Sequence, residues 1–275
     1  MRAYRVAYDG RAFYGFQRQP DVSTVEDVLL EGLADVGLEF EETPAGWAAA
    51  GRTDAGVSAL AQTVAFEAPD WLTPRPFTAH LPTDVHVWAS TPVPDDFHAI
   101  HDANRRQYTY FLHAPHADPE RIDDIEARLS GEHDFHNLAA EETGTVRDLS
   151  VTSTQDGVFR RIRVQADGFP RQLVRRLVAV YDRVRTGAAS LSFIDRVLSP
   201  EPLPGPDGIQ PAPAYPLVLT AVDYGLTFEA EQAAVDMAEE AFADRTLQAR
   251  TRAEVTTRLK RGVMEPGPHP TGDNP

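Results

Sequence analysis

An aspartate and an arginine lie two positions apart in the run AAGRTDAGVSA at residues 49–59, between Gly51 and Gly56. An ionised Asp54 could attack an electrophilic carbon or stabilise a developing positive charge, and Arg52 could bind a phosphate. The glycines would let the loop backbone turn tightly or approach another molecule closely. An ordinary surface turn is the competing interpretation, with Asp54 accepting a backbone hydrogen bond and Arg52 solvated. The loop is a candidate catalytic site, and the rest of the sequence must decide between this interpretation and a surface turn.

Arginine side chains are concentrated in two parts of the chain, one of them beside aromatic residues. Arg105 and Arg106 precede Tyr108 and Tyr110, and a longer segment carries a second group. Basic groups interleaved with aromatic rings are typical of surfaces that bind single-stranded or looped RNA. A solvated helix face that balances an acidic background is the alternative. The second group comprises Arg160, Arg161, Arg163, Arg171, Arg175, Arg176, Arg183 and Arg185.

Two histidine pairs have a spacing that could place metal ligands on one helix face, namely His98 with His101 and His133 with His136. Because no third ligand accompanies either pair, we expect solvated or core histidines and no metal site. The Gly-rich fingerprints of mononucleotide and dinucleotide binding are absent from the sequence. We therefore expect neither a metal nor a cofactor.

The composition is that of a cysteine-free globular chain of 275 residues. Without cysteine, the chain has no disulfides, thiol nucleophiles or thiolate metal sites, and a cytoplasmic location is the default expectation. No apolar run approaches the roughly 18 residues of a membrane span, so a membrane partner is not expected.

The charge balance is strongly acidic: 42 acidic residues stand against 26 basic ones, for a formal net charge of −16, and Lys260 is the single lysine. A surface rich in carboxylates and poor in lysine indicates adaptation to a cytoplasm of molar salt. Net charge alone would argue against a nucleic acid partner. At 1 M salt, however, the Debye length is only about 3 Å, so distant carboxylates hardly repel a phosphate. RNA binding would then depend on arginine forks, stacking and shape.

Hydrophobic periodicity predicts a doubled pattern of strands and helices, which indicates an α+β fold with two sheets or one continuous sheet. In the first half, a helix begins near Ser23 or Thr24, and strands cover 2–8, 45–50, 62–67, 85–89 and 107–113. In the second half, helices cover 118–129, 170–185 and 193–198, and strands cover 146–153, 158–166 and 217–224. A proline-rich connector spans 200–216, a helical tail spans 229–263, and residues 266–275 are expected to be disordered.

Six motifs occur in the order and spacing of one known family: YDGRAFYGFQRQ (8–19), AGRTDAGVSA (50–59), VPDDFHA (93–99), RRQYTY (105–110), GEHDF (131–135) and AVDY (221–224). From about Tyr4 to Tyr224, the chain resembles the tRNA pseudouridine synthase A (TruA) family. The resemblance implies an α+β fold of two ferredoxin-like (RNP-like) halves with joined antiparallel sheets, helices on the outer faces and a central active-site cleft. We accordingly expect halves at 1–113 and 114–228, followed by a helical and partly disordered tail at 229–275.

The resemblance also implies roles for individual residues. Asp54 occupies the position of the catalytic aspartate, and Tyr108 that of a tyrosine that stacks on the target base and accepts a proton. Arg175 matches the arginine that pairs with the aspartate, and Arg52 resembles a residue that holds the target nucleotide out of its helix. The other substrate-binding positions that we expect are Arg18, Arg105 and Arg106.

The chain departs from the family pattern at several positions. Phe16 stands where tryptophan is common, and Ser58 stands where many bacterial members have histidine. Around Arg175, the frequent pattern FxHxMVRNxVG is FPRQLVRRLVA here, so that Arg176 and Ala179 replace asparagine and glycine. Because GVSA is more similar to archaeal and eukaryotic relatives, and the composition is acidic, we expect an archaeal and specifically haloarchaeal member.

The function implied by the resemblance is conversion of uridine to pseudouridine at positions 38, 39 and/or 40 of the tRNA anticodon stem-loop, by a homodimer. This reaction detaches uracil at a nitrogen and rejoins it through a carbon, with no redox change, so it requires no cofactor or metal. A catalytically silent RNA-binding protein on the same fold is one alternative, against which the presence of Asp54, Tyr108 and Arg175 together argues. A metal hydrolase that uses the two histidine pairs is the other.

Activity and stability should both increase with KCl concentration. The net charge of −16 destabilises the compact state when screening is weak, and the Debye length grows from about 3 Å at 1 M to about 10 Å at 0.1 M salt. Counterion release acts in the opposite direction on RNA affinity. We expect the thermal midpoint and the tRNA modification rate to rise between about 0.1 and 1 M KCl, measured over one KCl series. Maximal stability and activity at the low end would contradict salt adaptation.

Overall fold

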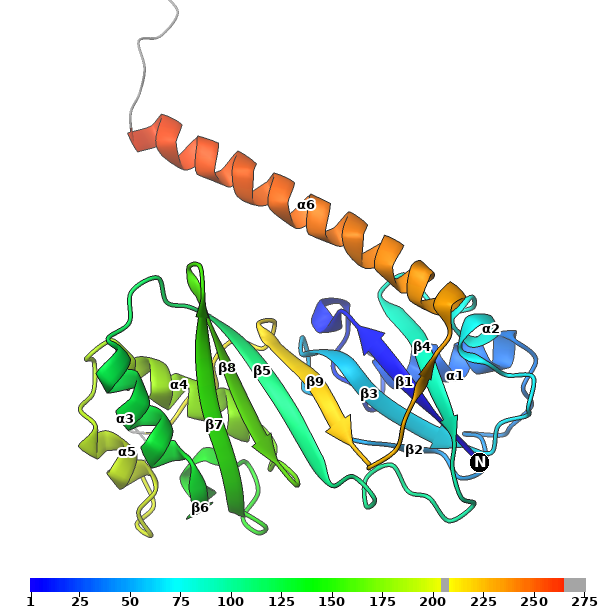
Figure 1. The fold of residues 1–275 in the computed structure, drawn as a ribbon, viewed down its shortest axis with the longest axis horizontal. Coiled ribbons are helices and arrows are strands. Elements are labelled where there is room, and N and C mark those ends of the chain that lie inside the picture. Colours follow the sequence, from blue (N-terminus) through cyan, green and yellow to red (C-terminus); the bar gives the residue numbers. More distant parts are fainter. Residues whose placement is uncertain (204–207, 265–275) are drawn as a thin grey trace, which may run out of the picture.

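The computed structural model describes residues 1–203 and 208–264, and its central feature is a ten-stranded, largely antiparallel sheet. The strand order is β10-β4-β1-β3-β9-β5-β8-β7-β6, with β2 paired to β3 off this path. In Figure 1 the sheet runs across the width of the molecule, with shorter helices toward both ends and one long helix above it. The prediction of an α+β fold with one joined sheet is confirmed.

The first half is built from β1 (Arg2–Tyr8), α1 (Val25–Asp35), β2 (Ala48–Ala49), β3 (Ser58–Phe66), α2 (Pro74–Thr78) and β4 (Val85–Pro92). Helix α1 begins at Thr24, whose hydroxyl accepts the Asp27 N–H while the Asp27 carboxylate accepts the Thr24 N–H. This reciprocal capping box satisfies two backbone donors at the helix start. Leu29 and Leu33, one turn apart on α1, are fully buried in the first core.

The second half is built from β5 (Arg105–His113), α3 (Pro119–Leu129), β6 (Gly131–Asp134), β7 (Val146–Asp156), β8 (Phe159–Ala166), α4 (Leu173–Arg185), α5 (Ser192–Val197) and β9 (Leu217–Asp223). Helix α4 buries apolar side chains every three to four residues, as the periodicity predicted, and these pack with α3 and α5 in a second core. The apolar face of α4 is what fixes its first turn, which carries Arg175, against the sheet.

The two halves follow the same path through space. Leaving aside the 3-10 helices, the chain order is β1-α1-β2-β3-α2-β4 in one half and, apart from the short β6 and α5, β5-α3-β7-β8-α4-β9 in the other. The spatial orders are β4-β1-β3-β2 and β9-β5-β8-β7, so each half is a β-α-β-β-α-β unit. The doubled pattern is present as predicted, whereas the ferredoxin-like description and the boundaries 1–113, 114–228 and 229–275 stay predictions.

Strand β9 joins the halves. It pairs antiparallel with β5 and, over residues 58–59 and 218–219, parallel with β3. Leu219 of β9 belongs to the first core and Leu217 to the second. Arg5 of β1 adds a connection, because its guanidinium donates to the Val222 carbonyl at 2.6 Å. The position of one half relative to the other therefore depends on β9.

The structure corrects several expected element bounds. The strand expected over 45–50 is only β2, because Gly46, at a φ of +72°, sits in a turn just before it. Strand β3 begins at Ser58, earlier than the expected 62. Two short strands were not expected, β6 and β10 (Glu229–Ala230), and both lie at ends of the sheet. The segment 266–275, expected to be disordered, lies outside the described residues.

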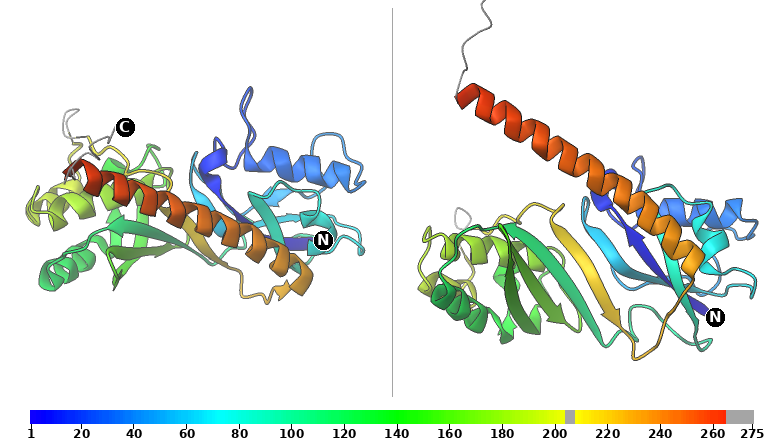
Figure 2. Two further views of the ribbon diagram at one scale, coloured as in Figure 1. Left: turned by 90° about the horizontal axis from the view of Figure 1, so that it is seen from above. Right: turned by 45° about the horizontal axis from the view of Figure 1, so that its top comes forward.

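The expected tail helix is a single long helix, α6 (Gln232–Met264), of 33 residues. The views in Figure 2 show that it starts beside the first half and that its C-terminal part projects away from the sheet. Among the described residues, no helix is long and apolar enough to cross a membrane.

Candidate active site

The loop that carries Asp54 connects β2 to β3 and is held by hydrogen bonds on both flanks. The Thr53 hydroxyl shares a 2.7 Å hydrogen bond with the buried Tyr8 hydroxyl. Two residues earlier, the Gln62 amide donates to the Gly51 carbonyl at 2.8 Å. After the aspartate, the Gly56 N–H donates to the Phe13 carbonyl at 3.2 Å. Strands β1 and β3 therefore fix the loop backbone just before the aspartate, and the segment that follows β1 holds it just after.

Glycine is required by backbone geometry at two positions around this loop. Gly56 has a φ of +80°, and Gly15, which packs against the loop, has a φ of +103°. A Cβ atom at Gly15 would also lie 2.9 Å from the Thr53 carbonyl oxygen. At Gly51, by contrast, an added Cβ would meet no atom within 4 Å. Close approach of a nucleotide to the loop backbone stays a prediction for Gly51, whereas Gly56 and Gly15 shape the loop itself.

The structure brings Asp54 and Arg175 together across the junction between the halves. Arg175, in the first turn of α4, donates from Nη1 to Asp54 Oδ2 at 3.0 Å and from Nε to the Ala212 carbonyl at 2.8 Å. The side chains of Arg175 and Asp54 are 15% and 22% exposed, respectively. The guanidinium is thus held at two points and orients the carboxylate in a largely desolvated position.

Tyr108 lies on β5 beside this pair. Its ring packs edge-on against Phe169, with ring centroids 5.2 Å apart. Burial raises the pKa of Tyr108 to about 12; the charge of Arg106 lowers it and that of Asp54 raises it. The phenol is therefore protonated near neutral pH, and its ring is held firmly enough to serve as a stacking surface.

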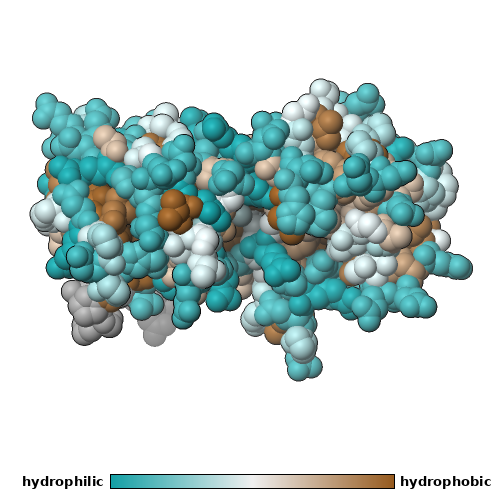
Figure 3. All heavy atoms as spheres, turned by 90° about the horizontal axis from the view of Figure 1, so that it is seen from below, coloured by the Kyte–Doolittle hydropathy of each residue, from teal (hydrophilic) through white to brown (hydrophobic). Residues whose placement is uncertain are grey.

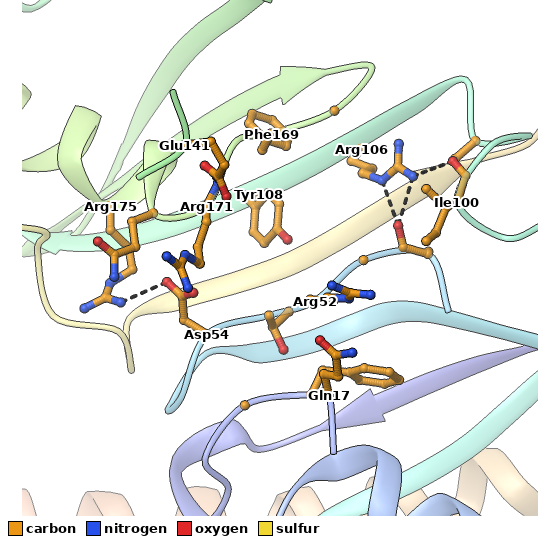
Figure 4. A pocket seen from close by; sticks show the side chains of 18 of the residues that line it. Gln17, Arg52, Asp54, Ile100, Arg106, Tyr108, Glu141, Phe169, Arg171 and Arg175 are labelled. Atoms are coloured by element: carbon orange, nitrogen blue, oxygen red, sulfur yellow. Dashed lines mark hydrogen bonds and ion pairs between the residues drawn. The ribbon is translucent and has the colours of Figure 1, made fainter. Parts of the chain in front are cut away.

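These side chains line a cleft of about 1190 Å³ between the halves. The surface seen from below in Figure 3 is hollowed between the two halves and is mostly hydrophilic. In the close view of Figure 4, Arg171 lies beside Asp54, and Arg52 reaches into the cleft from the loop that carries Asp54. The guanidinium groups of Arg52 and Arg171 have no hydrogen bond or ion pair within residues 1–203 and 208–264. The cleft therefore offers two uncommitted cations to a polyanion.

The other predicted substrate-binding arginines are placed differently. Arg106 is buried, and its guanidinium donates to the carbonyls of Ala50, Ile100 and Asp167. This arrangement gives it a structural role at the back of the cleft. Arg18 is exposed and paired with Asp27 at 2.9 Å. Arg105 is exposed and lines a separate pocket of about 370 Å³. Substrate contacts by these three arginines stay predictions.

One wall of the cleft is shaped by three residues to which the sequence motifs assign no separate role, Arg171, Gln172 and Arg176. Gln172 has a φ of +65°, rare for a residue with a side chain. Arg176 supports it, donating to the Gln172 side-chain oxygen at 3.1 Å and to the Ala139 carbonyl at 2.9 Å. Glu141 accepts the backbone N–H of Arg171 at 2.8 Å. A signal was available in the sequence, because Arg171 and Arg176 stand where the pattern FxHxMVRNxVG has histidine and asparagine.

The histidine pairs do not assemble into a metal centre. The rings of His98 and His101 lie 4.3 Å apart, but His98 Nδ1 accepts the Ile100 N–H. His133 Nε2 bonds to the Ser130 carbonyl. In the part of the chain that the structure describes, no three potential ligands are grouped so as to hold a metal ion. A metal hydrolase gains no support from these residues.

Comparison with known proteins identifies the class. A sequence model described as tRNA pseudouridine synthase matches residues 126–225, a segment that includes Arg175, and this match indicates the pseudouridine synthase class. Proteins named tRNA pseudouridine synthase A from Haloarcula marismortui (52% identical, covering 96% of this chain and 100% of that protein) and Natronomonas pharaonis (51% identical, covering 94% and 98%) are similar. The chain therefore belongs to the tRNA pseudouridine synthase A family, a family of isomerases, and the resemblance is confirmed.

A solved structure, "Crystal structure of the archaeal box H/ACA sRNP Nop10-Cbf5 complex", is also similar, but weakly. It aligns with a TM-score of 0.33 at 14% identity, over 64% of this chain and 44% of that chain. This likeness is too low to carry an argument.

Replacing Arg175 with lysine should slow catalysis more than it weakens RNA binding. Lysine keeps the charge but lacks the planar fork that holds Asp54 and the Ala212 carbonyl together. We expect kcat to fall roughly 10- to 100-fold, equivalent to about 1.4–2.8 kcal/mol, with the Kd for tRNA little changed. Arg128→Lys, at an exposed pair with Asp195, is the matched control and should leave kcat unchanged. Wild-type kcat in the Arg175 variant would show that the pair is not needed for the reaction.

Proposed function

We propose that the protein converts uridine to pseudouridine in the anticodon stem-loop of tRNA, at position 38, 39 and/or 40, with Asp54 as the catalytic carboxylate. The observation that carries the proposal is the 3.0 Å ion pair between Asp54 and Arg175 inside a cleft lined by arginines. The names of the relatives refer to tRNA, which supports the substrate class.

Asp54 is proposed to act on the glycosidic bond. Pseudouridine formation breaks the bond between uracil N1 and ribose C1′ and forms a bond between uracil C5 and the same carbon. A carboxylate oxygen can attack the ribose or the base, or stabilise a cationic sugar. Because Arg175 binds Oδ2, and Oδ1 has no hydrogen bond among the described residues, Oδ1 is the oxygen available for this step. All atoms of uridine are retained, so the reaction needs no cofactor.

Tyr108 is the proposed acceptor of the proton that leaves C5 after the base is rejoined, directly or through water. In the resting site its pKa is about 12, in part because Asp54 is negatively charged. Rejoining the base at C5 breaks any bond between Asp54 and the nucleotide, so the Asp54 carboxylate is charged again when the C5 proton leaves. Because the phenol is protonated at rest, it can accept this proton only while it passes its own proton on, to water or to uracil N1, which gains a proton in the product.

Capture of the target nucleotide is proposed to use the uncommitted arginines of the cleft. A uridine inside a stem must leave the base stack before its ribose is accessible. Tyr108, held edge-on by Phe169, offers a ring for the extruded base. Arg52 and Arg171 can bind the flanking phosphates or fill the space that the base leaves.

The proposal includes a homodimer that works in the cytoplasm. A cleft of about 1190 Å³ holds a nucleotide and its neighbours but is small beside an L-shaped tRNA, so a second surface is needed for the rest of the molecule. A catalytically silent RNA-binding protein would not require a carboxylate paired with an arginine across the two halves, and we therefore favour the enzyme.

Replacing Asp54 with asparagine should abolish pseudouridine formation while leaving tRNA binding within a few-fold of wild type. The change keeps the size of the side chain and removes the charge that the reaction requires. Mapping pseudouridine in a tRNA transcript after incubation measures both the loss and the position modified. Asp156→Asn, at an exposed ion pair with Arg161, is the control and should modify normally. Near wild-type turnover by the Asp54 variant would remove Asp54 from the mechanism.

Replacing Tyr108 with phenylalanine separates stacking from proton transfer. The ring remains, so the Kd for tRNA should be unchanged, whereas loss of the hydroxyl should lower kcat roughly 10²- to 10⁴-fold, the range of general acid–base catalysis. Tyr110→Phe is a matched control, because Tyr110 lies two residues further along β5 and is buried in the second core. Equal rates for the Tyr108 variant and wild type would reduce Tyr108 to a stacking residue.

A further inference from the structure

Helix α6 consists of an anchored part and a free part. Ala234 and Ala238 are buried against the first half, and Phe242 packs edge-on to His86 with ring centroids 5.4 Å apart. The last anchor is Arg245, which pairs with Asp84 at 2.7 Å and with Asp9 at 3.5 Å. Every residue from 246 to 264 is exposed. At 1.5 Å per residue, this free part is a rigid projection about 28 Å long.

The charge of α6 changes sign where it leaves the body. The anchored part carries Asp236, Glu239, Glu240 and Asp244. The free part carries one acidic residue, Glu254, against five basic ones, Arg250, Arg252, Arg258, Lys260 and Arg261. In a chain of net charge −16, this is a strong local concentration of positive charge, and it includes the single lysine.

Stabilisation of the helix end does not account for this charge. Basic residues in the last turn interact favourably with the helix dipole, but that effect is confined to about one turn. Arg250 and Arg252 lie three turns or more before the end of the described helix at Met264. Among the described residues, the hydrogen bonds and ion pairs of this part stay within α6 itself. The basic side chains are therefore free to bind something outside the chain.

The free part of α6 starts close to the rim of the catalytic cleft. Its last anchor, Arg245, binds Asp9, which caps the 3-10 helix η1 (Gly10–Ala12). The segment that follows η1, from Tyr14 to Gln19, lines the cleft. In Figure 1, α6 then continues away from the sheet and ends well clear of the second half. A stem-loop held in the cleft would belong to a molecule large enough to reach this helix.

We infer that residues 246–264 form an arm that binds the phosphate backbone of tRNA outside the anticodon stem-loop. The inference rests on the proposed function for the identity of the substrate. Arginine forks bind phosphate at short range and so remain useful where salt screens the long-range field.

A second copy of the chain is a less suitable occupant for this helix. Besides Met264, the last residue of the described helix, the exposed large apolar side chains of residues 246–264 are Leu247, Val255, Leu259 and Val263. At 3.6 residues per turn, the side chain of Val263 points about 160° around the helix axis from that of Leu247. A coiled-coil seam needs a repeat of 3.5 residues that stays on one side. The apolar residues therefore wind around the helix and do not form a dimer seam.

Two variants of the full chain test the arm. One replaces the five basic residues with glutamine (Arg250→Gln, Arg252→Gln, Arg258→Gln, Lys260→Gln and Arg261→Gln). The matched control replaces the four apolar residues with glutamine (Leu247→Gln, Val255→Gln, Leu259→Gln and Val263→Gln) and keeps every charge. Circular dichroism verifies that both retain α6, and light scattering gives their oligomeric state. Each variant is assayed with a full-length tRNA transcript and with the isolated anticodon stem-loop of the same tRNA.

For the basic variant we expect the Kd for full-length tRNA to rise at least about tenfold, with a shallower dependence of log Kd on log salt, by about 0.9 for each phosphate that the arm no longer neutralises. KM should rise with Kd, kcat should stay within about twofold, and the Kd for the stem-loop should not change, because the arm binds RNA outside it. The apolar control should bind both RNAs like wild type.

Three results would contradict the proposed arm. The first is an unchanged Kd of the basic variant for full-length tRNA, and the second is an equal loss of affinity for the stem-loop. The third is that the apolar substitutions convert a dimer to monomers while tRNA binding stays intact. The last result would assign the helix to a protein interface. A wild-type protein that binds tRNA through the arm but forms no pseudouridine would refute the proposed function alone. A wild-type protein that does not bind tRNA would refute both.

Discussion

The pairing of Asp54 with Arg175 depends on one short interaction, the parallel pairing of β3 with β9 over two residues of each strand. Asp54 belongs to the first half and Arg175 to the second, and the pair forms only if the halves meet in one register. A shift of one residue would turn the side chains of β9 to the opposite face of the sheet. The division of β9 between two cores and the hydrogen bond from Arg5 to β9 specify that register.

Arginine has two separate uses in this lysine-poor chain. The buried Arg106 and the partly buried Arg176 donate to backbone carbonyls of Ala50, Ile100 and Ala139, which lie in irregular segments around the cleft. Carbonyls in such segments lack strand or helix partners, and a planar guanidinium can satisfy several at once. The exposed arginines of the cleft and of α6 are left uncommitted. Burial thus separates the cations that build the site from those available to a polyanion.

Local patterns predicted most of the fold. The capping box at Thr24 predicts the start of α1, and the three-to-four-residue apolar spacing predicts α4, in both cases from local sequence alone. Strand β2 was predicted too long, and strand β6 was missed. Each forms because it pairs with the next strand along the chain, β3 and β7 respectively, and neither is long enough to have a detectable pattern of its own.

The candidate site likewise has features that local sequence predicts and features that only the folded chain creates. The proximity of the Asp54 loop, Tyr108 and Arg175 was predictable because these residues sit in motifs with fixed spacing. The structural role of Arg106 was not, since its partners come from three segments that only the folded chain brings together. The left-handed backbone of Gln172 was not predictable either, because nothing in the residue type favours it and a hydrogen bond from Arg176 supports it.

The place of β9 in the sheet has a consequence for the order of synthesis. This strand lies in the middle of the sheet, yet it leaves the ribosome after every other strand except the edge strand β10. Until it arrives, β3 and β5 each present an unpaired edge, and the halves can fold only as separate units. Asp54 and Arg175 are synthesised well before anything holds them together. A nascent chain, or a chain truncated before β9, therefore lacks the strand that joins the two walls of the cleft.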